Sequence, residues 1–365
     1  MMDANAMADF GLGWLEASGQ HADIVLSTRV RLARNLQGHA FAPKLRDSER
    51  IQIYEQVRQA AERHSMLKGG ISFDLASLSP LSRRVLLERH LISRELAGEN
   101  DETAHMGAGL VLGPKDNVSV MVNEEDHLRL QTLMSGLRLS EAYSRLDQAD
   151  EEMGSQIPFA YHQEFGFLTS CPTNVGTGLR ASVLMHLPGL VLTKEIGQVL
   201  QGIGQVGLTF RGLYGEGSEV IGNFFQISNQ TTLGKSEEDL IEHLQKIVWK
   251  VIQVEIEKRA VLMRDAPSVM EDKIWRAYGL LRYARALSFD EVMNLLSGVR
   301  LGVSMNLLPG LRVYTLNKIM IFAQTAHLEQ AAGRRLTDAE SDLHRAAYVR
   351  RVLAAEGNIP AGPEN

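Results

Sequence analysis

The feature that most constrains the fold is a long amphipathic stretch, residues 236–264, after which almost no strand-like alternation remains. Its apolar residues recur every three or four positions, which places them on one face of an α-helix, and Ser236 with Asp239 forms a capping signal at its start. We therefore predict a boundary near residue 264. An α+β domain over residues 1–264 precedes a smaller, all-helical domain over residues 265–365, in which four segments have helical patterns: 271–287, 289–303, 311–333 and 338–357.

The first strand of the α+β domain is predicted over residues 24–33, which alternate with period two. This alternation places Leu26 and Val30 on one face of the strand and Arg29 and Arg31 on the other. The strand therefore has one basic face.

Further elements follow along the chain. Residues 46–64 favour a helix that Asp47 or Ser48 caps. Residues 108–133 favour a hairpin, with an acidic cluster ending its second strand. For residues 171–192 we predict a loop followed by a helix or a strand. For residues 205–229 we predict a strand, a glycine-rich loop and a second strand.

Composition excludes several classes of function. The 365 residues are 44% hydrophobic, which is enough for a substantial core. With 38 basic and 44 acidic residues the formal charge is −6, so the whole chain does not favour nucleic acid or an anionic membrane surface. A single cysteine, no signal-peptide pattern and no apolar run long enough for a bilayer predict a cytoplasmic protein. Because the net charge is negative, any affinity for phosphate must come from a local cluster of basic residues.

The stretch GIGQVG at residues 202–207 matches the glycine pattern of dinucleotide sites. Such a site needs a strand before the glycines and a helix after them. Here the preceding residues favour a helix and the following residues favour a strand. We interpret these glycines as a helix end and a turn.

Arginines at strand or loop positions are the first candidates for chemistry. A single arginine is usually a solvated surface residue. Several guanidinium groups that gather in the fold could hold a triphosphate without a P-loop, because their planar forks match phosphate oxygens. The candidates are Arg29, Arg31, Arg129, Arg180 and Arg211.

Carboxylates form the second group of candidates, with Glu124, Glu125 and Asp126 after a predicted strand and Glu216 and Glu219 in a glycine-rich loop. Charged residues at such positions are often only solvated. Beside a phosphate site, however, they would bind a cation, either Mg²⁺ or a guanidinium. A guanidinium is a poor nucleophile while protonated, so two fixed carboxylates could orient it and accept its proton.

Cys171 precedes a proline and a turn. A lone cysteine is more often a small buried apolar residue than a reactive thiol. Were it in a substrate pocket, its thiolate would add negative charge beside a guanidinium.

Four motifs occur in the order and spacing of one enzyme family: STRVRLARNL from residue 27, NEEDHLR from 123, CPTNVGTGLRASV from 171 and RGLYGEG from 211. By these motifs the chain resembles the phosphagen kinases, the ATP:guanidino phosphotransferases, and in particular their bacterial branch, the protein-arginine kinases. The resemblance implies a catalytic domain with an antiparallel sheet flanked by helices, and a helical domain for dimerisation, regulation or substrate binding. It implies transfer of the γ-phosphoryl group of ATP to arginine side chains of proteins, in quality control or stress response.

Carried over by position, the resemblance implies that Glu125, as the base, and Glu216 orient the guanidinium, with Glu124 and Cys171 in the same pocket. Mg²⁺ is expected on ATP oxygens and water, so no metal site formed by the protein is predicted. The implied ATP site consists of Ser27, Thr28, Arg29, Val30, Arg31, His90, Arg129, Arg180, Ala181, Ser182, Val183, Leu184, Arg211, Gly212, Leu213, Tyr214, Gly215 and Glu216.

Domain order favours the bacterial branch. Creatine and arginine kinases carry a helical domain ahead of the catalytic domain, and it encloses a small guanidino substrate. In this chain the first motif begins at residue 27. We therefore expect no such lid, and an acceptor site open enough for an arginine on a protein.

One position departs from the family. The bacterial enzymes commonly carry an RDxxRA motif that forms an allosteric pocket for phosphoarginine. This chain has Ser341 in place of the first arginine, followed by Asp342 and Arg345. A charge-assisted contact to the phosphoryl group is therefore missing, although Arg334 and Arg335 are close in sequence.

Two other functions remain open from the sequence: a small-molecule guanidino kinase, and a phosphoarginine-binding adaptor or pseudokinase that serves a protease. Further expectations from the resemblance are a homodimer, a zinc-binding activator protein and a Clp chaperone as partners. Apolar residues of the helical domain could form its core, a dimer surface or both: Leu307, Leu308, Leu311 and Val313.

Overall fold

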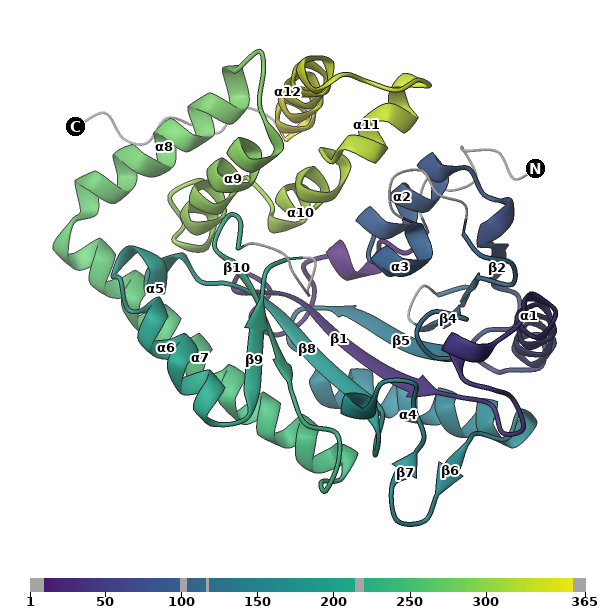
Figure 1. Ribbon diagram of the computed structural model, residues 1–365. Coiled ribbons are helices and arrows are strands. Elements are labelled where there is room, and N and C mark those ends of the chain that lie inside the picture. The colour runs from purple at the N-terminus through teal and green to yellow at the C-terminus, as the bar shows by residue number, and fades with distance from the viewer. Residues whose placement is uncertain (1–9, 99–103, 116–117, 214–219, 357–365) are drawn as a thin grey trace.

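The computed structural model describes residues 10–98, 104–115, 118–213 and 220–356. Within these ranges the centre is an eight-stranded antiparallel sheet in the order β2-β3-β4-β5-β1-β8-β10-β9 (Figure 1). A separate small hairpin, β6 with β7, precedes β8. The strands are β1 (Val25–Arg34), β2 (Ile71–Asp74), β3 (Gly109–Leu112), β4 (Val118–Val122), β5 (Leu128–Ser135), β6 (Tyr161–His162), β7 (Gly166–Phe167), β8 (Leu179–His186), β9 (Leu208–Arg211) and β10 (Phe224–Asn229).

Helices cover one face of the sheet and bury its apolar side chains in a large core. Val30 and Leu32 of β1 belong to this core, together with Leu146 of α4 and Leu244 of α7. The helices on this side are α1 (Asp47–Ala61), α4 (Leu139–Gln156), α5 (Pro188–Leu192), α6 (Ile196–Gln205) and α7 (Glu237–Asp265).

The other face is covered only at its ends. Two short helices, α2 (Pro80–Glu88) and α3 (Arg94–Ala97), form a small core with β2, β3 and β4. A third core joins Leu133 and Leu184 of the sheet to the C-terminal helices. These helices are α8 (Pro267–Tyr283), α9 (Phe289–Ser304), α10 (Val313–Phe322), α11 (Thr325–Ala332) and α12 (Asp338–Ala355). The α+β class with flanking helices and a helical C-terminal region, which the sequence predicts, is confirmed.

The long helix α7 begins where its capping signal predicts. The Ser236 hydroxyl accepts a hydrogen bond from the Asp239 amide (3.1 Å), and the Asp239 carboxylate accepts one from the Ser236 amide (3.3 Å). After Asp265 the chain turns at once into α8, whose first residue is Pro267. Proline fits this position because a first-turn amide has no intrahelical partner.

Leu26 does not lie where simple alternation placed it. A bulge between Val25 and Ser27 shifts the register with β8. Leu26 therefore packs with Leu133 and the C-terminal helices, whereas Val30 lies in the core on the opposite face. An extra residue in one strand re-aims the side chains around it, and period-two patterns do not reveal this.

Two helix boundaries also differ from the prediction. Helix α1 begins at Asp47 with Arg46 at the N-cap, and the Glu49 carboxylate accepts a hydrogen bond from the Arg46 amide (3.1 Å). Neither Asp47 nor Ser48 is the cap. The predicted helical segment 311–333 consists of two helices, α10 and α11, because the backbone at Gln324 is extended.

The glycines of GIGQVG end α6 and lead into β9. This is the reverse of the order in a dinucleotide site, as predicted. In the segment 171–192 the loop leads into a strand, β8, and then into the short helix α5. Among the described helices, none combines the length and apolar composition needed to cross a membrane.

The C-terminal helices hold the segment that precedes β1. The Asn317 side chain donates a hydrogen bond to the Leu15 carbonyl (2.8 Å), and the Arg300 guanidinium donates to the Ala22 carbonyl (2.7 Å). Arg300 also donates to the Asn317 side-chain oxygen (2.6 Å). The short 3-10 helix η2 (Gly13–Leu15), which carries Trp14, is thereby fixed between the sheet and α10.

Replacing Leu244 by alanine tests the contribution of α7 to the main core. Leu244 is 0% exposed, so we expect Leu244→Ala to lower the free energy of unfolding by about 2–5 kcal/mol. Ile256 lies on the same helix and is 42% exposed, so Ile256→Ala is the matched control and should stay within about 0.5 kcal/mol of the parent. Urea unfolding measures both. Equal losses in the two variants would contradict the described packing of α7.

Candidate active site

The predicted arginines lie on the open face of the sheet. Arg31 of β1 pairs directly with Arg180 of β8, and Arg29 precedes Arg31 by two residues on the same face. Arg129 of β5 pairs with Ala33, which lies two residues after Arg31 and so shares its face. Arg211, the last residue of β9, pairs with Gln226 of β10 on the same face. Cross-strand partners project to the same face of a sheet. The fold therefore gathers these five side chains on one surface.

Neighbouring guanidinium groups on this surface lower one another's pKa. Burial, reinforced by the charge of Arg129, lowers the pKa of Arg29 to about 10. Burial and three neighbouring arginines lower the pKa of Arg31 well below its ordinary value. Like charges placed opposite each other destabilise a sheet. An anion with several oxygens would relieve this repulsion, so the arginine face is suited to a polyphosphate.

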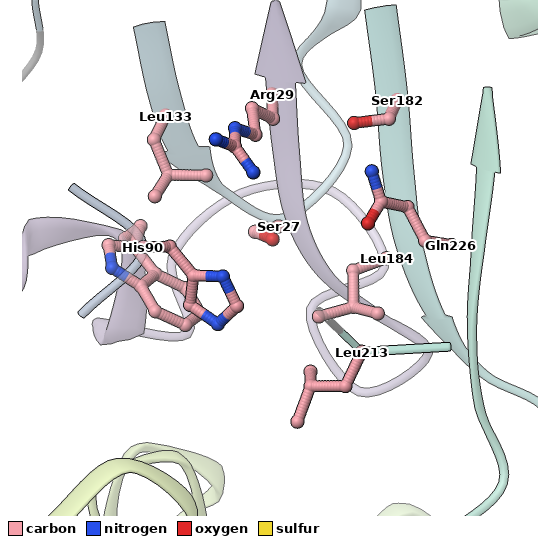
Figure 2. A pocket seen from close by; sticks show the side chains of 9 residues that line it. Ser27, Arg29, His90, Leu133, Ser182, Leu184, Leu213 and Gln226 are labelled. Atoms are coloured by element: carbon pink, nitrogen blue, oxygen red, sulfur yellow. The ribbon is translucent and has the colours of Figure 1, made fainter. Parts of the chain in front are cut away.

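A small cavity opens at one end of the arginine face (Figure 2). Figure 2 shows Arg29 above the cavity and His90 at its side, with Leu184 and Leu213 across from them. The lining residues are Trp14, Ser27, Arg29, His90, Leu133, Ser182, Leu184, Leu213 and Gln226.

His90 reaches this cavity from the end of α2. Burial and the charge of Arg29 lower the pKa of His90 to about 3, so its ring is neutral at physiological pH. The Trp14 indole meets the imidazole edge to face, with 5.3 Å between ring centroids. A neutral imidazole in an apolar wall can exchange hydrogen bonds with an uncharged ring without adding charge.

Carboxylates lie at the opposite end of the arginine face. Arg129 donates to Glu124 (2.6 Å) and to Glu125 (3.0 Å). The Glu124 side chain is almost completely buried, whereas that of Glu125 is 44% exposed. Burial raises the pKa of Glu125 although Arg129 opposes the effect. Glu125 is thus a reachable carboxylate with greater than usual basicity.

A buried network brings the Cys171 segment to these carboxylates. The Asp126 carboxylate accepts hydrogen bonds from the Asn35 side chain and the Ser170 amide, each at 2.6 Å. The Asn174 side chain donates to Glu125 (3.4 Å). Cys171 is partly exposed, and its Sγ lies 3.0 Å from the Thr173 hydroxyl. Asp126 therefore holds the loop of Cys171 beside Glu125.

Not every residue of the predicted ATP site points toward this face. The side chains of Val30, Ala181 and Val183 lie in the core on the opposite face. Thr28 is buried, and its hydroxyl donates to the Gly136 carbonyl (2.6 Å). Gly212 connects Arg211 to Leu213 of the cavity. Three predicted positions lie outside the described residues: Tyr214, Gly215 and Glu216.

The predicted phosphoarginine pocket contains an ion pair on α12. Arg345 is buried and donates to Asp342 (2.6 Å), to the Ala323 carbonyl (2.8 Å) and to the Leu287 carbonyl (2.8 Å). Ser341 is buried beside it. Arg334 is exposed and pairs with Glu340. These contacts tie α12 to the end of α10 and to the segment before α9.

Gln131 is a site residue that the sequence reasoning missed. Its side-chain oxygen accepts from Arg29 Nε (2.7 Å), and its side-chain nitrogen donates to the His90 carbonyl (3.1 Å). The signal was present, because Gln131 lies two residues after Arg129 on the same strand and so shares its face. Trp14, Asn35 and the anchoring role of Asp126 were also missed. Their partners are distant in sequence, so local patterns do not identify these contacts.

The arrangement supports one kind of chemistry. Along β1, the six steps from Ser27 to Ala33 span about 20 Å between the cavity and the carboxylates. A flat base could occupy the cavity, with a polyphosphate along the arginines and a cationic group between Glu125 and Cys171. Transfer of the terminal phosphoryl group between them would need alignment and charge neutralisation, which such a surface supplies.

Comparison of the sequence with known proteins identifies one family. The family described as ATP:guanido phosphotransferase, C-terminal catalytic domain, matches residues 52–258, and the protein-arginine kinase McsB C-terminal domain matches residues 267–361. The chain is 46% identical to the protein-arginine kinase of Moorella thermoacetica, covering 93% of this chain and 97% of that protein. It is 45% identical to that of Symbiobacterium thermophilum, covering 94% and 96%.

Solved structures of other guanidino kinases share the fold. The duplicated taurocyamine kinase of Schistosoma mansoni with bound transition-state-analogue components has a TM-score of 0.59 at 26% identity, covering 74% of this chain and 38% of that one. A lombricine kinase has a TM-score of 0.57 at 25% identity, covering 71% of each chain. The arginine face, the carboxylates and these matches along nearly the whole chain agree with one another. The chain belongs to the ATP:guanido phosphotransferases, within the family of protein-arginine kinases.

Proposed function

We propose that the chain is an ATP-dependent protein-arginine kinase, which transfers the γ-phosphoryl group of ATP to the guanidinium of arginine side chains in proteins. Full-length relatives named protein-arginine kinase support this activity. The observation that carries it is the placement of Glu125, a reachable carboxylate with a raised pKa, directly beside the arginine face. A phosphate donor and a cationic acceptor would meet at this point.

ATP would lie along the open face of the sheet. Its base would enter the cavity beside His90 and Leu213, and its phosphates would follow Arg29, Arg31 and Arg180 toward the carboxylates. Arg129 and Arg211 complete the set on the same face. Mg²⁺ would be held by phosphate oxygens and water, and it would neutralise part of the triphosphate charge.

The acceptor arginine would lie between Glu125 and Cys171. Its guanidinium is a weak nucleophile while protonated, so Glu125 accepts an N–H proton as the nitrogen attacks phosphorus. The bond from the γ-phosphorus to the leaving oxygen of ADP breaks, and a P–N bond forms. Glu124 holds Arg129 in place for the transferred group. Glu216, assigned by its motif, would orient the other side of the guanidinium.

The cellular setting extends this proposal. We place the enzyme in the cytoplasm, as a homodimer, acting on exposed or unfolded arginine-containing segments in protein quality control. A zinc-binding activator and a Clp chaperone are the partners that the family resemblance implies. In the helical region Leu308 and Leu311 are buried in the chain's own core, whereas Leu307 and Val313 are partly exposed. Of these four residues, Leu307 and Val313 are therefore the ones that a dimer contact could still reach.

Substrate choice is the direct test of the function. Incubation with ATP, Mg²⁺ and an unfolded arginine-containing protein should produce acid-labile phosphoarginine in that protein, detected by mass spectrometry under neutral conditions. Free arginine should be a much poorer acceptor, because binding energy from flanking peptide contributes to catalysis. Turnover of free arginine alone would instead assign a small-molecule guanidino kinase. Phosphoarginine binding without turnover would assign an adaptor.

Removing one arginine of this face should separate stability from ATP binding. Without ATP, the neighbouring charges destabilise Arg31, so Arg31→Met should raise the melting temperature of the unliganded protein. The same change should weaken the stabilisation that ATP provides, because that stabilisation grows with the ratio of ATP concentration to Kd. Arg264→Met removes an exposed arginine as the control and should change neither quantity. Unchanged ATP stabilisation in Arg31→Met would contradict the proposed phosphate site.

The pH dependence of kcat/KM, which reports ionisation in the free enzyme, tests Glu125 as the base. Because the pKa of Glu125 is raised, the protonated, inactive form persists to higher pH than for an ordinary glutamate. The rate should therefore rise with pH through a pKa above 4.5. Glu125→Gln should lower kcat by about 10²- to 10⁴-fold and remove this acid limb. Glu62→Gln, an exposed change at the C-cap of α1, is the control. A Glu125→Gln enzyme with the parental profile would contradict the assignment.

A further inference from the structure

Two helices that are distant in sequence meet beside the proposed nucleotide site. Helix α2 packs against α11 of the C-terminal helical region, and Figure 1 shows the two side by side. The contact centres on three residues, Glu88, Arg89 and His327, which we call the latch. Arg84 and Glu329 form a separate ion pair in the same interface (2.7 Å).

Glu88 acts as the cap of a helix that belongs to another part of the chain. Its carboxylate accepts hydrogen bonds from the amides of Ala326 (2.8 Å) and His327 (3.1 Å) in the first turn of α11. The residue at the N-cap position is Gln324, whose side-chain amide bonds back to the Met320 carbonyl (3.3 Å). First-turn amides have no intrahelical acceptor, and a carboxylate is favoured at this end of the helix dipole. The start of α11 therefore depends on α2.

The His327 side chain completes the latch. Its Nδ1 lies 2.6 Å from the Glu88 carboxylate, and its Nε2 accepts from Arg89 Nε (3.2 Å). Since a guanidinium can only donate, Nε2 is the acceptor nitrogen and Nδ1 carries the hydrogen that it donates to Glu88. The His327 side chain is 2% exposed, so water does not compete for these bonds.

The latch lies one residue from the nucleotide cavity. Helix α2 ends at Glu88, and His90 has a left-handed backbone conformation with φ of 61°. A residue other than glycine keeps this conformation only where its surroundings hold it. The His90 carbonyl accepts from Gln131, which in turn accepts from Arg29. An unbroken series of contacts thus runs from α11 through the end of α2 to the first arginine of the phosphate site.

We propose that the latch positions His90, and through Gln131 also Arg29, for ATP, so that His327 of the helical region is a positioning residue for nucleotide binding. This inference rests on the proposed function, since it takes the cavity at His90 as the site of the base. His327 itself is not among the residues that line the cavity, and its side chain contacts Glu88, Arg89 and Phe322 instead. It acts by holding the helix end from which His90 projects.

Isothermal titration of ATP against single and double variants tests the latch. His327→Ala and Glu88→Gln should each raise the Kd for ATP by about fivefold or more, the lower end of typical coupling between sites. The double variant should have the same Kd for ATP as the single variant that binds ATP more weakly, because both changes break the same contact between Glu88 and His327. His327→Asn keeps a donor for Glu88 and should bind ATP more tightly than His327→Ala.

Kinetics separate positioning from general damage to the fold. Latch variants should raise KM for ATP while KM for the protein substrate and kcat stay near those of the parent. Arg84→Met is the matched control, since it breaks the other ion pair of the interface without touching the end of α2. It should leave the Kd for ATP unchanged. An equal effect of Arg84→Met would show that the interface acts as a whole, and this would overturn the latch.

Other outcomes are equally decisive. Folded His327→Ala with the parental Kd, or additive effects in the double variant, would overturn the latch. If His327→Ala does not fold, Glu88→Gln provides the test. A Kd for ATP equal to that of the parent would then overturn the latch. A parent protein that does not bind ATP would refute the proposed function instead, so the two failures are distinguishable.

Discussion

Mutual repulsion between guanidinium groups on one face of a sheet is the constraint on which the rest of the structure depends. Arg31 and Arg180 face each other across two central strands, and Arg29 and Arg129 lie within the same field. A flexible surface would let these side chains separate into water. The central strands, hydrogen bonded on both sides and backed by α4 and α7, keep them together. In the proposed function, a bound polyphosphate would bring negative charge to these guanidinium groups.

The carboxylates at one end of this face divide the work between them. Glu124 is buried and holds Arg129, whereas Glu125 remains accessible and more basic than an ordinary glutamate. Asp126 takes no part in the charge pairing and anchors the Cys171 loop through backbone and amide donors. Three consecutive acidic residues therefore have three different environments. Such separation of neighbouring acids by their surroundings is how a site assigns them different roles.

Strong periodic patterns and family motifs were enough to predict the α+β class, the cap of α7 and the arginine face. Local exceptions escaped, because tertiary contacts decide them. The bulge at Leu26 is one example. The break at Gln324 is another, since the Ala323 carbonyl accepts a hydrogen bond from Arg345 and the Glu88 carboxylate accepts from the amides that begin α11. Gln131 could have been found from its spacing to Arg129. Trp14 could not, because its place depends on Asn317 and Arg300.

The anchoring of the first segment by the last helices has a consequence for biosynthesis. Trp14 forms one wall of the nucleotide cavity, yet the hydrogen bonds that fix its segment come from Arg300 and Asn317. These residues leave the ribosome roughly 300 residues later, which is about 15–60 s at ordinary translation rates. A nascent chain with a finished sheet would still lack this wall. If this cavity takes the nucleotide as proposed, nucleotide binding would be acquired only by the completed polypeptide.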